Sequence, residues 1–234
     1  MKLNINNLSH TYDVEVLHEL NFALDGKRSI ALLGQSGSGK STLLRIMSGL
    51  EQPTLGDVSV NDLKVTNPDY KKHVGFVFQS HNLFPHLTLE RNISLILEKT
   101  RGVEKTKAIE TATENLTKLG LGDQVHKLPK NVSGGQAQRA SIARALSMDP
   151  DVIFLDEPTS SLDPILTDDV LTAVEDLRDS GKDFVFVTHV LSFVRDFADY
   201  VIFMHDGNIV EHGDPAILDA PTSEVFQSFM SKVR

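Results

Sequence analysis

Apolar and polar residues alternate along the first part of the chain, as they do in a strand with one buried face. Residues 1–6 follow this pattern in the manner of an edge strand, and residues 20–24 repeat it. The continuous apolar run at residues 28–33 instead predicts a parallel strand that is buried on both faces. Further strands are expected at residues 58–60 and 73–78, which we assign to an α/β core. The pattern therefore predicts an N-terminal antiparallel layer followed by a core.

The spacing of apolar residues then changes to a helical period. Three helices are expected, at residues 88–99, 105–119 and 135–148. The second has an apolar face made of Ile109, Ala112, Leu116 and Leu119. The segments Arg101-Gly102 and Gly120-Leu121-Gly122 separate the helices. We expect residues 84–148 to form a helical subdomain inserted into a core of residues 1–83 and 149–234.

Strands and helices alternate again after this insertion. A strand that ends at Asp156 is followed by a helix, three strands and a helical tail, expected at residues 152–156, 164–178, 183–187, 200–204, 209–211 and 216–234. Strands that alternate with helices favour a mainly parallel sheet. No segment is left over for an additional regulatory domain.

Composition narrows the function. The chain has 234 residues and a net charge of −9, which argues against a protein that holds nucleic acid or anionic lipid by charge. It has no cysteine, hence neither disulfides nor a thiolate metal site, as suits a reducing compartment. Its first residues do not have the pattern of a signal peptide, and no apolar run approaches the ~20 residues of a membrane helix.

A glycine-rich loop follows the buried strand at residues 28–33. Its sequence fits the pattern G-x-x-x-x-G-K-[ST], in which glycines allow the backbone to wrap phosphates and the helix start attracts anions. Lys40 would reach the β- and γ-phosphates, and Ser41 would bind Mg²⁺. The predicted nucleotide-binding residues of this loop are Gly34, Gln35, Ser36, Gly37, Ser38, Gly39, Lys40, Ser41 and Thr42.

Two carboxylates end the strand at residues 152–156. The carboxyl ends of strands in a doubly wound sheet are where ligands bind. Asp156 would hold Mg²⁺ through its water shell, and Glu157 would orient and polarise the attacking water. An acidic turn after a strand is the ordinary reading of such a pair when it stands alone. Its combination with the glycine loop favours the catalytic reading.

A second polar, glycine-rich helix start lies between these motifs, at Ser133, Gly134, Gly135 and Gln136. A hydroxyl, two glycine amides and the positive end of a helix dipole make it a second anion site. In isolation, an ordinary serine-capped helix is the simpler reading. One chain has no second nucleotide for this site.

Taken in order, these motifs resemble the ATP-binding-cassette (ABC) family over essentially the whole chain. Ser133–Gln136 with Arg139 and residues 142–146 is similar to the family signature and its helix, and residues 156–164 to the second carboxylate motif and the D-loop. Residues 186–189 and 76–79 are similar to the switch strand and to the strand that ends in the Q-loop glutamine. The resemblance implies an α/β fold: a P-loop NTPase core with a mainly parallel sheet, an N-terminal antiparallel β layer and an inserted helical subdomain.

The resemblance also implies roles for residues that would mean little alone. Gln79 would contact Mg²⁺ or the attacking water, and His189 would sense the γ-phosphate beside the catalytic Glu157. Tyr12 would stack on adenine, although a strand tyrosine is more often half-buried packing. The metal ligands would be Ser41, Gln79 and Asp156. The residues acting on the opposite subunit's nucleotide would be Ser133, Gly134, Gly135, Gln136 and Asp163.

The implied cofactors are ATP and Mg²⁺, and the implied partner is a second copy of the chain in a head-to-tail dimer with two composite sites. Transmembrane permease subunits and an extracytoplasmic substrate-binding protein would complete the system at the cytoplasmic face of the inner membrane, without nucleic acid. Residues 82–88, 201–204 and 207–211 resemble importers of polar amino acids. Ser80, His81 and Arg91 depart from that pattern in the expected docking surface for the permease.

Two other interpretations stay open at this point. One is a cassette ATPase that powers a membrane complex without import, of the lipoprotein-release or division type. The other is a non-transport cassette that acts on nucleic acid or the ribosome, which the acidic composition disfavours.

Overall fold

The computed structural model describes residues 1–177 and 181–233, which fall into two compact units. The first unit contains Met1–Lys72 and the residues from Asp183 onward, and the second contains His73–Lys182. The second unit therefore contains the helical region together with the strands that come directly before and after it in the sequence. The predicted subdomain at residues 84–148 lies within the second unit, and its boundaries stay a prediction.

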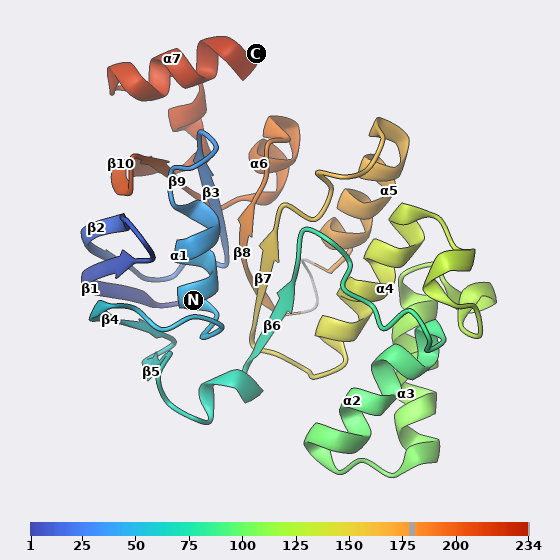
Figure 1. The fold of residues 1–234 in the computed structure, drawn as a ribbon. Helices are drawn as coiled ribbons and strands as arrows, with labels where there is room; N and C mark the ends of the chain where they lie inside the picture. The colour runs from blue at the N-terminus through green and yellow to red at the C-terminus, as the bar shows by residue number, and fades with distance from the viewer. Residues whose placement is uncertain (178–180, 234) are drawn as a thin grey trace. The chain divides into compact units, whose positions relative to one another are not determined.

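The N-terminal strands of the first unit form an antiparallel sheet in the order β2-β1-β4-β5 (Figure 1). The strands are β1 (Leu3–Thr11), β2 (Glu15–Leu24), β4 (Leu55–Val60) and β5 (Leu63–Lys64). The prediction of an edge strand at the N-terminus is wrong, since β1 pairs with β2 on one side and β4 on the other. Alternation reports which face of a strand is buried and says nothing about its edges.

The assignment of residues 58–60 to the α/β core is also wrong. These residues belong to β4, in which Val60 lies opposite Leu3 and Val58 opposite Ile5 of β1. Both valines are buried on one face of the antiparallel sheet. The antiparallel layer predicted for the N-terminus therefore extends beyond the glycine-rich loop in sequence.

Parallel strands form the other sheet of the first unit. The completely buried β3 (Ser29–Gly34) lies between β8 (Asp183–Val187) and β9 (Tyr200–His205), parallel to both, and β10 (Asn208–Gly213) is antiparallel to β9. Helix α1 (Lys40–Met47) follows β3 and contacts strands of both sheets, as Figure 1 shows. This strand–loop–helix order is the one that the glycine motif predicts.

Helical segments complete the first unit, and aromatic packing holds two of them, α6 (Leu191–Phe197) and α7 (Glu224–Val233). The others are η1 (Tyr70–Lys72) and η5 (Pro215–Leu218). Helix α6 was not predicted, and the single tail expected at residues 216–234 is two helices, with Arg234 outside the described residues. The ring of Phe226 in α7 stacks on Phe203 of β9 with centroids 4.2 Å apart, which fixes the tail to the sheet.

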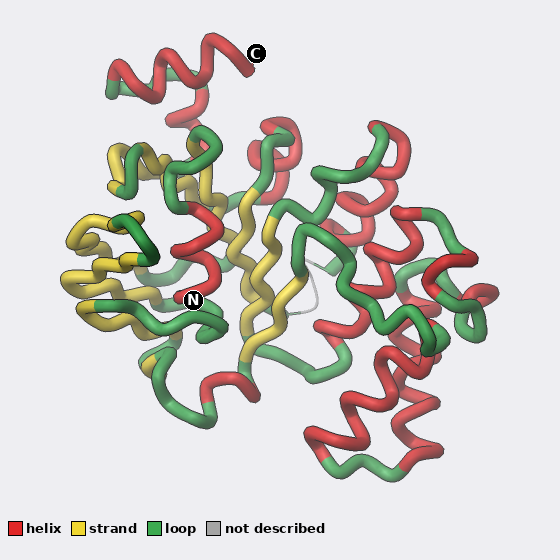
Figure 2. The backbone as a smooth tube through the Cα atoms, in the orientation of Figure 1, coloured by secondary structure: helices red, strands yellow, loops and turns green. Residues whose placement is uncertain are grey.

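The second unit combines one pair of parallel strands with helices (Figure 2). Strands β6 (Val74–Val77) and β7 (Val152–Asp156) are in register from Val74 opposite Val152 to Val77 opposite Leu155. The helices are α2 (Leu89–Arg101), α3 (Lys105–Lys118), η2 (Gly122–Gln124), η3 (Pro129–Asn131), α4 (Gly134–Leu146) and α5 (Pro164–Glu175). The helical insertion between two strands is confirmed. Helix α5 was expected to reach Arg178, which lies outside the described residues.

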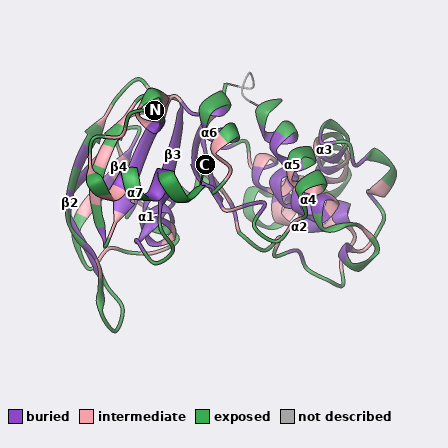
Figure 3. Ribbon diagram, turned by 90° about the horizontal axis from the view of Figure 1, so that it is seen from above, coloured by how far each residue is buried: buried purple, intermediate pink, exposed green. Residues whose placement is uncertain are grey.

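These helices carry buried residues, coloured purple in Figure 3. On α3, Ala112 and Leu116 are buried as predicted, but Ala108 replaces Ile109, which is only half-buried. A row spaced by three or four residues can shift by one position, because neighbouring residues lie at the border of the same face. Among the described residues, no helix combines the length and apolar character that crossing a membrane requires.

Candidate functional site

The glycine-rich loop has backbone geometry that only glycine accommodates at two positions. Gly34 has a φ of 148°, and a Cβ there would overlap the carbonyl oxygen of Met204 in β9. Gly39 has a φ of 95°, and a Cβ there would lie 2.7 Å from Leu17 Cδ2. The first and last glycines of the motif are therefore needed for close packing of the loop on its own unit.

Lys40 is the first residue of α1, and it is buried, with 5% of its surface exposed. Its Nζ donates to the carbonyl oxygen of Gln35, 2.7 Å away, so the side chain folds back over the loop. The loop thus holds an ammonium group beside the amino-terminal end of a helix, where anions are favoured.

Strand register brings His189 to the same edge of the sheet as the loop. Leu32 of β3 lies opposite Val187 of β8, so Gly34 and His189, each two positions further on, leave the sheet at the same level. His189 is exposed, whereas Thr188 before it is buried and accepts a hydrogen bond from the Val190 amide. The first unit therefore presents the imidazole close to the predicted phosphate-binding loop.

Tyr12 lies in the turn after β1, with half of its surface exposed. Its hydroxyl donates to Glu51 Oε2 at 2.6 Å, and its ring meets His10 edge-on. Burial raises the pKa of the Tyr12 hydroxyl, and the hydrogen bond to Glu51 adds to this, while Thr42 acts in the opposite direction. The phenol therefore stays protonated at neutral pH and remains a donor to Glu51.

The carboxylate motif lies in the second unit. Asp156 ends β7 and is buried, with 3% of its surface exposed, and Glu157 follows in a left-handed conformation with a φ of 45°. Because Val77 lies opposite Leu155, Gln79 reaches the same level as Glu157 at the strand ends. A non-glycine residue in this conformation is uncommon and often marks a functional position. No sequence signal indicated it.

The signature residues form a capped helix start. Ser133 is the N-cap of α4: its Oγ accepts from the Gln136 amide, and Gln136 Oε1 accepts from the Ser133 amide. A Cβ on Gly135 would lie 3.2 Å from Leu166 Cδ2 of α5, so this glycine allows the two helices to approach. The simpler reading as a serine cap therefore holds, and Ser133 and Gly134 are also exposed, as a contact with another chain would need.

The predicted D-loop residue Asp163 also begins a helix. Its Oδ1 accepts from the amides of Ile165 and Leu166, each at 3.0 Å, at the start of α5. Pro164 at the first helical position needs no such partner, because it has no amide hydrogen. The same carboxylate is exposed at the surface of the second unit.

Three side chains, whose contacts no sequence pattern predicted, hold the segment from Phe78 to Thr88, which contains Gln79. Gln138 of α4 is buried and donates to the Phe78 carbonyl oxygen at 3.0 Å. Arg144 of the same helix donates to the carbonyl oxygens of Asn82 and His81, at 2.7 and 3.3 Å. Asn92 of α2 bonds to the backbone of residues 84–88. Their spacing from Gln79 in sequence carries no signal, because only the fold brings them together.

The fold also lowers the pKa values of two basic side chains at this segment. Burial lowers the pKa of His81, and the neighbouring charge of Arg144 lowers it further. Burial likewise lowers the pKa of Arg144, although a guanidinium stays charged at neutral pH. His81 is therefore neutral at neutral pH, and the positive charge at this surface belongs to the arginine.

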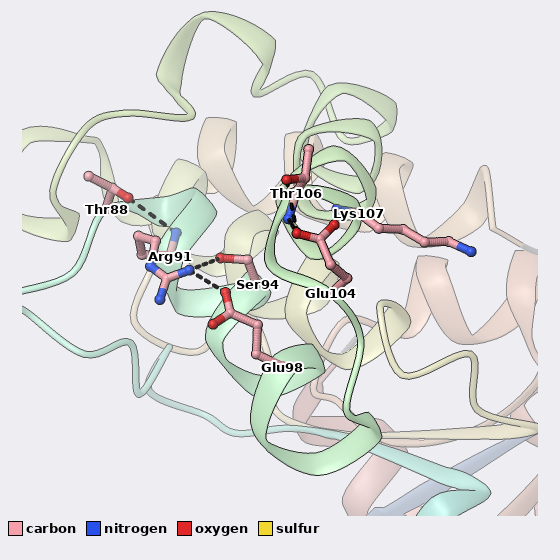
Figure 4. Close-up of polar contacts among 7 residues, drawn as sticks. All are labelled: Thr88, Arg91, Ser94, Glu98, Glu104, Thr106 and Lys107. Carbon is pink, nitrogen blue, oxygen red and sulfur yellow. Dashed lines mark hydrogen bonds and ion pairs between the residues drawn. The ribbon is translucent and has the colours of Figure 1, made fainter.

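Arg91, which departs from the family pattern, is held within its own helix (Figure 4). Its Nη1 donates to Ser94 Oγ at 3.0 Å and to Glu98 Oε1 at 2.6 Å, one and two turns further along α2, respectively. Thr88 caps the start of this helix by accepting from the Arg91 amide. The arginine thus pairs with a carboxylate and leaves little uncompensated charge at the predicted docking surface.

The predicted metal ligands have the right chemistry for Mg²⁺. Ser41, Gln79 and Asp156 offer a hydroxyl, an amide oxygen and a carboxylate, all of which are hard oxygen donors. Within the described residues, no group of three or more His, Asp or Glu side chains is placed to hold a metal by itself. Such a set fits a cation that keeps part of its coordination for water and phosphate oxygens.

Comparisons with known proteins agree with these motifs. The family model described as ABC transporter matches residues 17–160. The chain is 40% identical over 230 residues to the glutamine transport ATP-binding protein GlnQ of Escherichia coli, covering 96% of each chain. It is 42% identical to the L-cystine transport system ATP-binding protein TcyN of Escherichia coli, covering 93% of this chain and 92% of that protein. It is 39% identical to the arginine transport ATP-binding protein ArtM of Bacillus subtilis, covering 94% of each.

Solved structures extend the agreement to the fold. The ATP-binding cassette MJ0796, solved as a dimer in a post-hydrolysis state bound to ADP and Pi, matches with a TM-score of 0.81 and 32% identity over 91% of this chain and 98% of that chain. A second dimeric structure of this bacterial ABC transporter cassette matches with a TM-score of 0.80. The family model covers more than half of the sequence, and the relatives cover nearly all of it. The chain therefore belongs to the ABC transporter family, as an ATP-binding chain with the family's ATPase fold.

Proposed function

We propose that this chain is the ATP-hydrolysing subunit of a membrane importer of polar amino acids. The observation that carries the proposal is similarity, over nearly the full length of both chains, to proteins named for the transport of glutamine, cystine and arginine. The buried lysine of the glycine-rich loop supports ATP binding as the source of energy. The acidic composition speaks against a role on nucleic acid.

In this proposal, the loop from Gly34 to Thr42 holds the phosphates, and Tyr12 stacks on the base. Mg²⁺, held by Ser41, Asp156 and Gln79, would neutralise charge on the phosphates. Glu157 orients and polarises the attacking water, and His189 contacts the γ-phosphate. The left-handed backbone at Glu157 supports a positional role for that carboxylate.

A second copy of the chain would complete each site. We infer that Ser133, Gly134, Gly135 and Gln136 of one subunit contact the γ-phosphate held by the other, with Asp163 near the same interface. The exposure of Ser133, Gly134 and Asp163 supports this, as does the dimeric state of the cassette of similar fold. A head-to-tail pair of this kind closes with two-fold symmetry and holds two nucleotides.

The remaining partners follow from the importer proposal. Transmembrane permease subunits would carry the chain at the cytoplasmic face of the inner membrane, and an extracytoplasmic substrate-binding protein would deliver the amino acid. The segment after Gln79, held by Arg144 and Asn92, is the surface that we assign to the permease. Conformational change on hydrolysis would pass through this segment.

Amino-acid uptake tests the transport proposal directly. The Glu157→Gln substitution is introduced at the chromosomal copy, and uptake of labelled glutamine, glutamate, arginine and cystine is measured in whole cells. Uptake of at least one should fall, while uptake of a labelled sugar should not. Unchanged uptake of every amino acid, together with defective lipoprotein release or division, would support the non-import alternative instead.

Nucleotide binding tests the glycine-rich loop. Lys40→Ala removes a buried cation from a site for a tetra-anion, and it should weaken Mg-ATP binding by about 2–5 kcal/mol in calorimetry. Lys71→Ala, at an exposed lysine of the same unit, is the matched control and should bind ATP normally. Normal affinity of a folded Lys40→Ala protein would refute the assignment of the loop.

The composite site is tested by trapping the dimer. Glu157→Gln retains shape but removes the charge that polarises water, so hydrolysis should fall by roughly 10²–10⁴-fold. Bound ATP should then hold two chains together, and the variant with Mg-ATP should elute as a dimer on a sizing column. Adding Ser133→Arg should abolish this dimer. A dimer that is indifferent to Ser133→Arg would contradict the composite site.

A further inference from the structure

A single carboxylate connects two aromatic side chains beside the glycine-rich loop. Glu51 Oε2 accepts from the Tyr12 hydroxyl at 2.6 Å, and Glu51 Oε1 lies 3.1 Å from Nε2 of His10. The imidazole approaches that oxygen at an angle outside hydrogen-bond geometry, so this second contact is an ion pair or a close polar contact. His10 is buried and Glu51 is mostly covered, whereas Tyr12 is half exposed.

The backbone around Glu51 is fixed on both sides. The amides of Leu50 and Glu51 donate to the carbonyl oxygen of Arg45, at 3.0 and 3.3 Å, so the carboxylate is attached to the end of α1. The Thr54 amide donates to the Ser9 carbonyl oxygen at 3.1 Å, and the Thr11 amide donates to Thr54 Oγ1 at 3.0 Å. Glu51 is therefore anchored to the helix that begins at Lys40 and, through the following residues, to β1.

Tyr12 has no comparable anchor of its own. It lies outside the strand, in a turn where its amide bonds to the Val14 carbonyl oxygen, and half of its surface faces solvent. An exposed aromatic side chain is free to change rotamer, and it loses that freedom when it stacks on a ligand. The Glu51 bond holds the far end of the ring, and His10 contacts the ring edge-on, with centroids 4.6 Å apart and planes at 81°.

We propose that Glu51, backed by His10, is a positioning residue that presents the Tyr12 ring to the base of the bound nucleotide. The inference rests on the stacking role proposed for Tyr12. Preorganisation of this kind improves affinity by removing the ordering cost from the binding step. It links the base site to the end of α1, the helix whose first residues belong to the predicted phosphate-binding loop.

Electrostatics alone makes the opposite prediction. A carboxylate near a tetra-anionic nucleotide repels it, so removal of the charge would tighten ATP binding if Glu51 had no positioning role. Weaker ATP binding after removal of the Glu51 carboxylate therefore supports the positioning role, whereas tighter binding supports charge repulsion alone. Asp13→Asn is the matched control, because it removes an exposed carboxylate next to Tyr12 in the chain.

The experiment is a double-mutant cycle with Glu51→Ala and Tyr12→Phe, read by calorimetry with Mg-ATP and, in parallel, with inorganic tripolyphosphate, which lacks a base. Each single variant should weaken ATP binding about three- to tenfold, as expected for the loss of the net contribution of one hydrogen bond. The losses should be less than additive in the double variant, because both substitutions remove the bond between Tyr12 and Glu51. Tripolyphosphate affinity should not fall, and Asp13→Asn should bind ATP as well as the wild type or better.

Three results would overturn the positioning role. These are ATP affinity that is unchanged or increased in Glu51→Ala, equal losses for ATP and tripolyphosphate, or additive losses in the double variant. Tyr12→Ala, measured alongside, identifies a different failure. If this variant binds ATP normally, the stacking role itself is wrong, whereas a loss in Tyr12→Ala without a loss in Glu51→Ala removes only the positioning role.

Discussion

Asn92 provides the sharpest test of how the segment after Gln79 is held. Its side chain is completely buried in α2. The amide nitrogen donates to the carbonyl oxygens of Phe84, Leu87 and Thr88, at 3.1, 3.1 and 2.9 Å, and the amide oxygen accepts from the Phe84 amide at 2.6 Å. One side chain thus satisfies backbone groups across the whole turn that leads into the helix.

The cost of removing these bonds can be worked out from their number. An amide nitrogen has only two hydrogens, so its three acceptors share them, and the side chain makes about three full bonds. At about 1 kcal/mol each, Asn92→Ala should lose roughly 3 kcal/mol, and more where a carbonyl group stays buried without a partner. Asn92→Asp should be worse at neutral pH, because it keeps the acceptor but places a negative charge against three carbonyl oxygens.

Urea unfolding followed by circular dichroism measures the effect. With a typical slope of about 1–3 kcal/mol per molar urea, the midpoint should fall by about 1 M or more. Hydrogen exchange by mass spectrometry should show faster exchange at residues 84–92, while residues 34–47 of the other unit keep their protection. Asn131→Asp, at an exposed asparagine of the same unit, is the control. A midpoint within error of wild type, or an equal loss in the control, would refute the reasoning.

Three further predictions follow from single contacts. Gly34→Ala should unfold the loop or abolish ATP binding, because its Cβ would overlap the backbone of β9. Gly37→Ala should lower stability by only the ~1–2 kcal/mol of a left-handed backbone, since no atom lies within 4 Å of its Cβ. Thermal melts and calorimetry with ATP distinguish the two variants. Arg144→Lys should speed amide exchange at residues 81–83, because lysine lacks the planar fork whose two nitrogens each donate to one of the carbonyl oxygens, and unchanged exchange would contradict this. Hydrogen bonds from the Thr106 amide, the Thr106 hydroxyl and the Lys107 amide lower the pKa of Glu104 below its ordinary value of 4.5 (Figure 4). Because the folded pKa is lower than the unfolded one, this stabilisation is present above about pH 4.5 and is lost as the pH falls through the folded value. The melting-temperature gap between wild type and Glu104→Gln should therefore close in acid, with Glu110→Gln as the exposed control.

Local signals identified the motifs because each motif is contiguous. The glycine loop needs a strand before it and a helix after it, and both are encoded in neighbouring residues, so the prediction of β3 and α1 is confirmed. The same holds for β7 with Asp156 and for the start of α4 at Ser133. Strong periodicity likewise predicted α2 and α3 to within two residues at either end.

Contacts between distant segments were not predictable in this way. The pairing of β4 with β1 depends on which edge of the sheet remains for it, and alternation at Val58 and Val60 fits either sheet. Helix α6 has only seven residues and is aromatic, so its pattern does not differ from that of a buried strand. The side chains of Gln138 and Arg144 reach the segment that contains Gln79 across some sixty residues of sequence. A single sequence contains no local trace of such a contact.

Ser133 shows why a structural role and a functional role need not compete. As the cap of α4, its Oγ accepts a hydrogen bond from the Gln136 amide, which uses one lone pair of the oxygen. The hydroxyl hydrogen is not used in that bond, and it is the hydrogen that a phosphate oxygen would accept. Capping also fixes the side-chain rotamer and the exposed amides at the helix start, so the hydroxyl is held at the end of the helix where an anion would bind. The serine cap that the simpler reading required is thus the arrangement that an anion site needs, and the two readings describe different atoms of one residue.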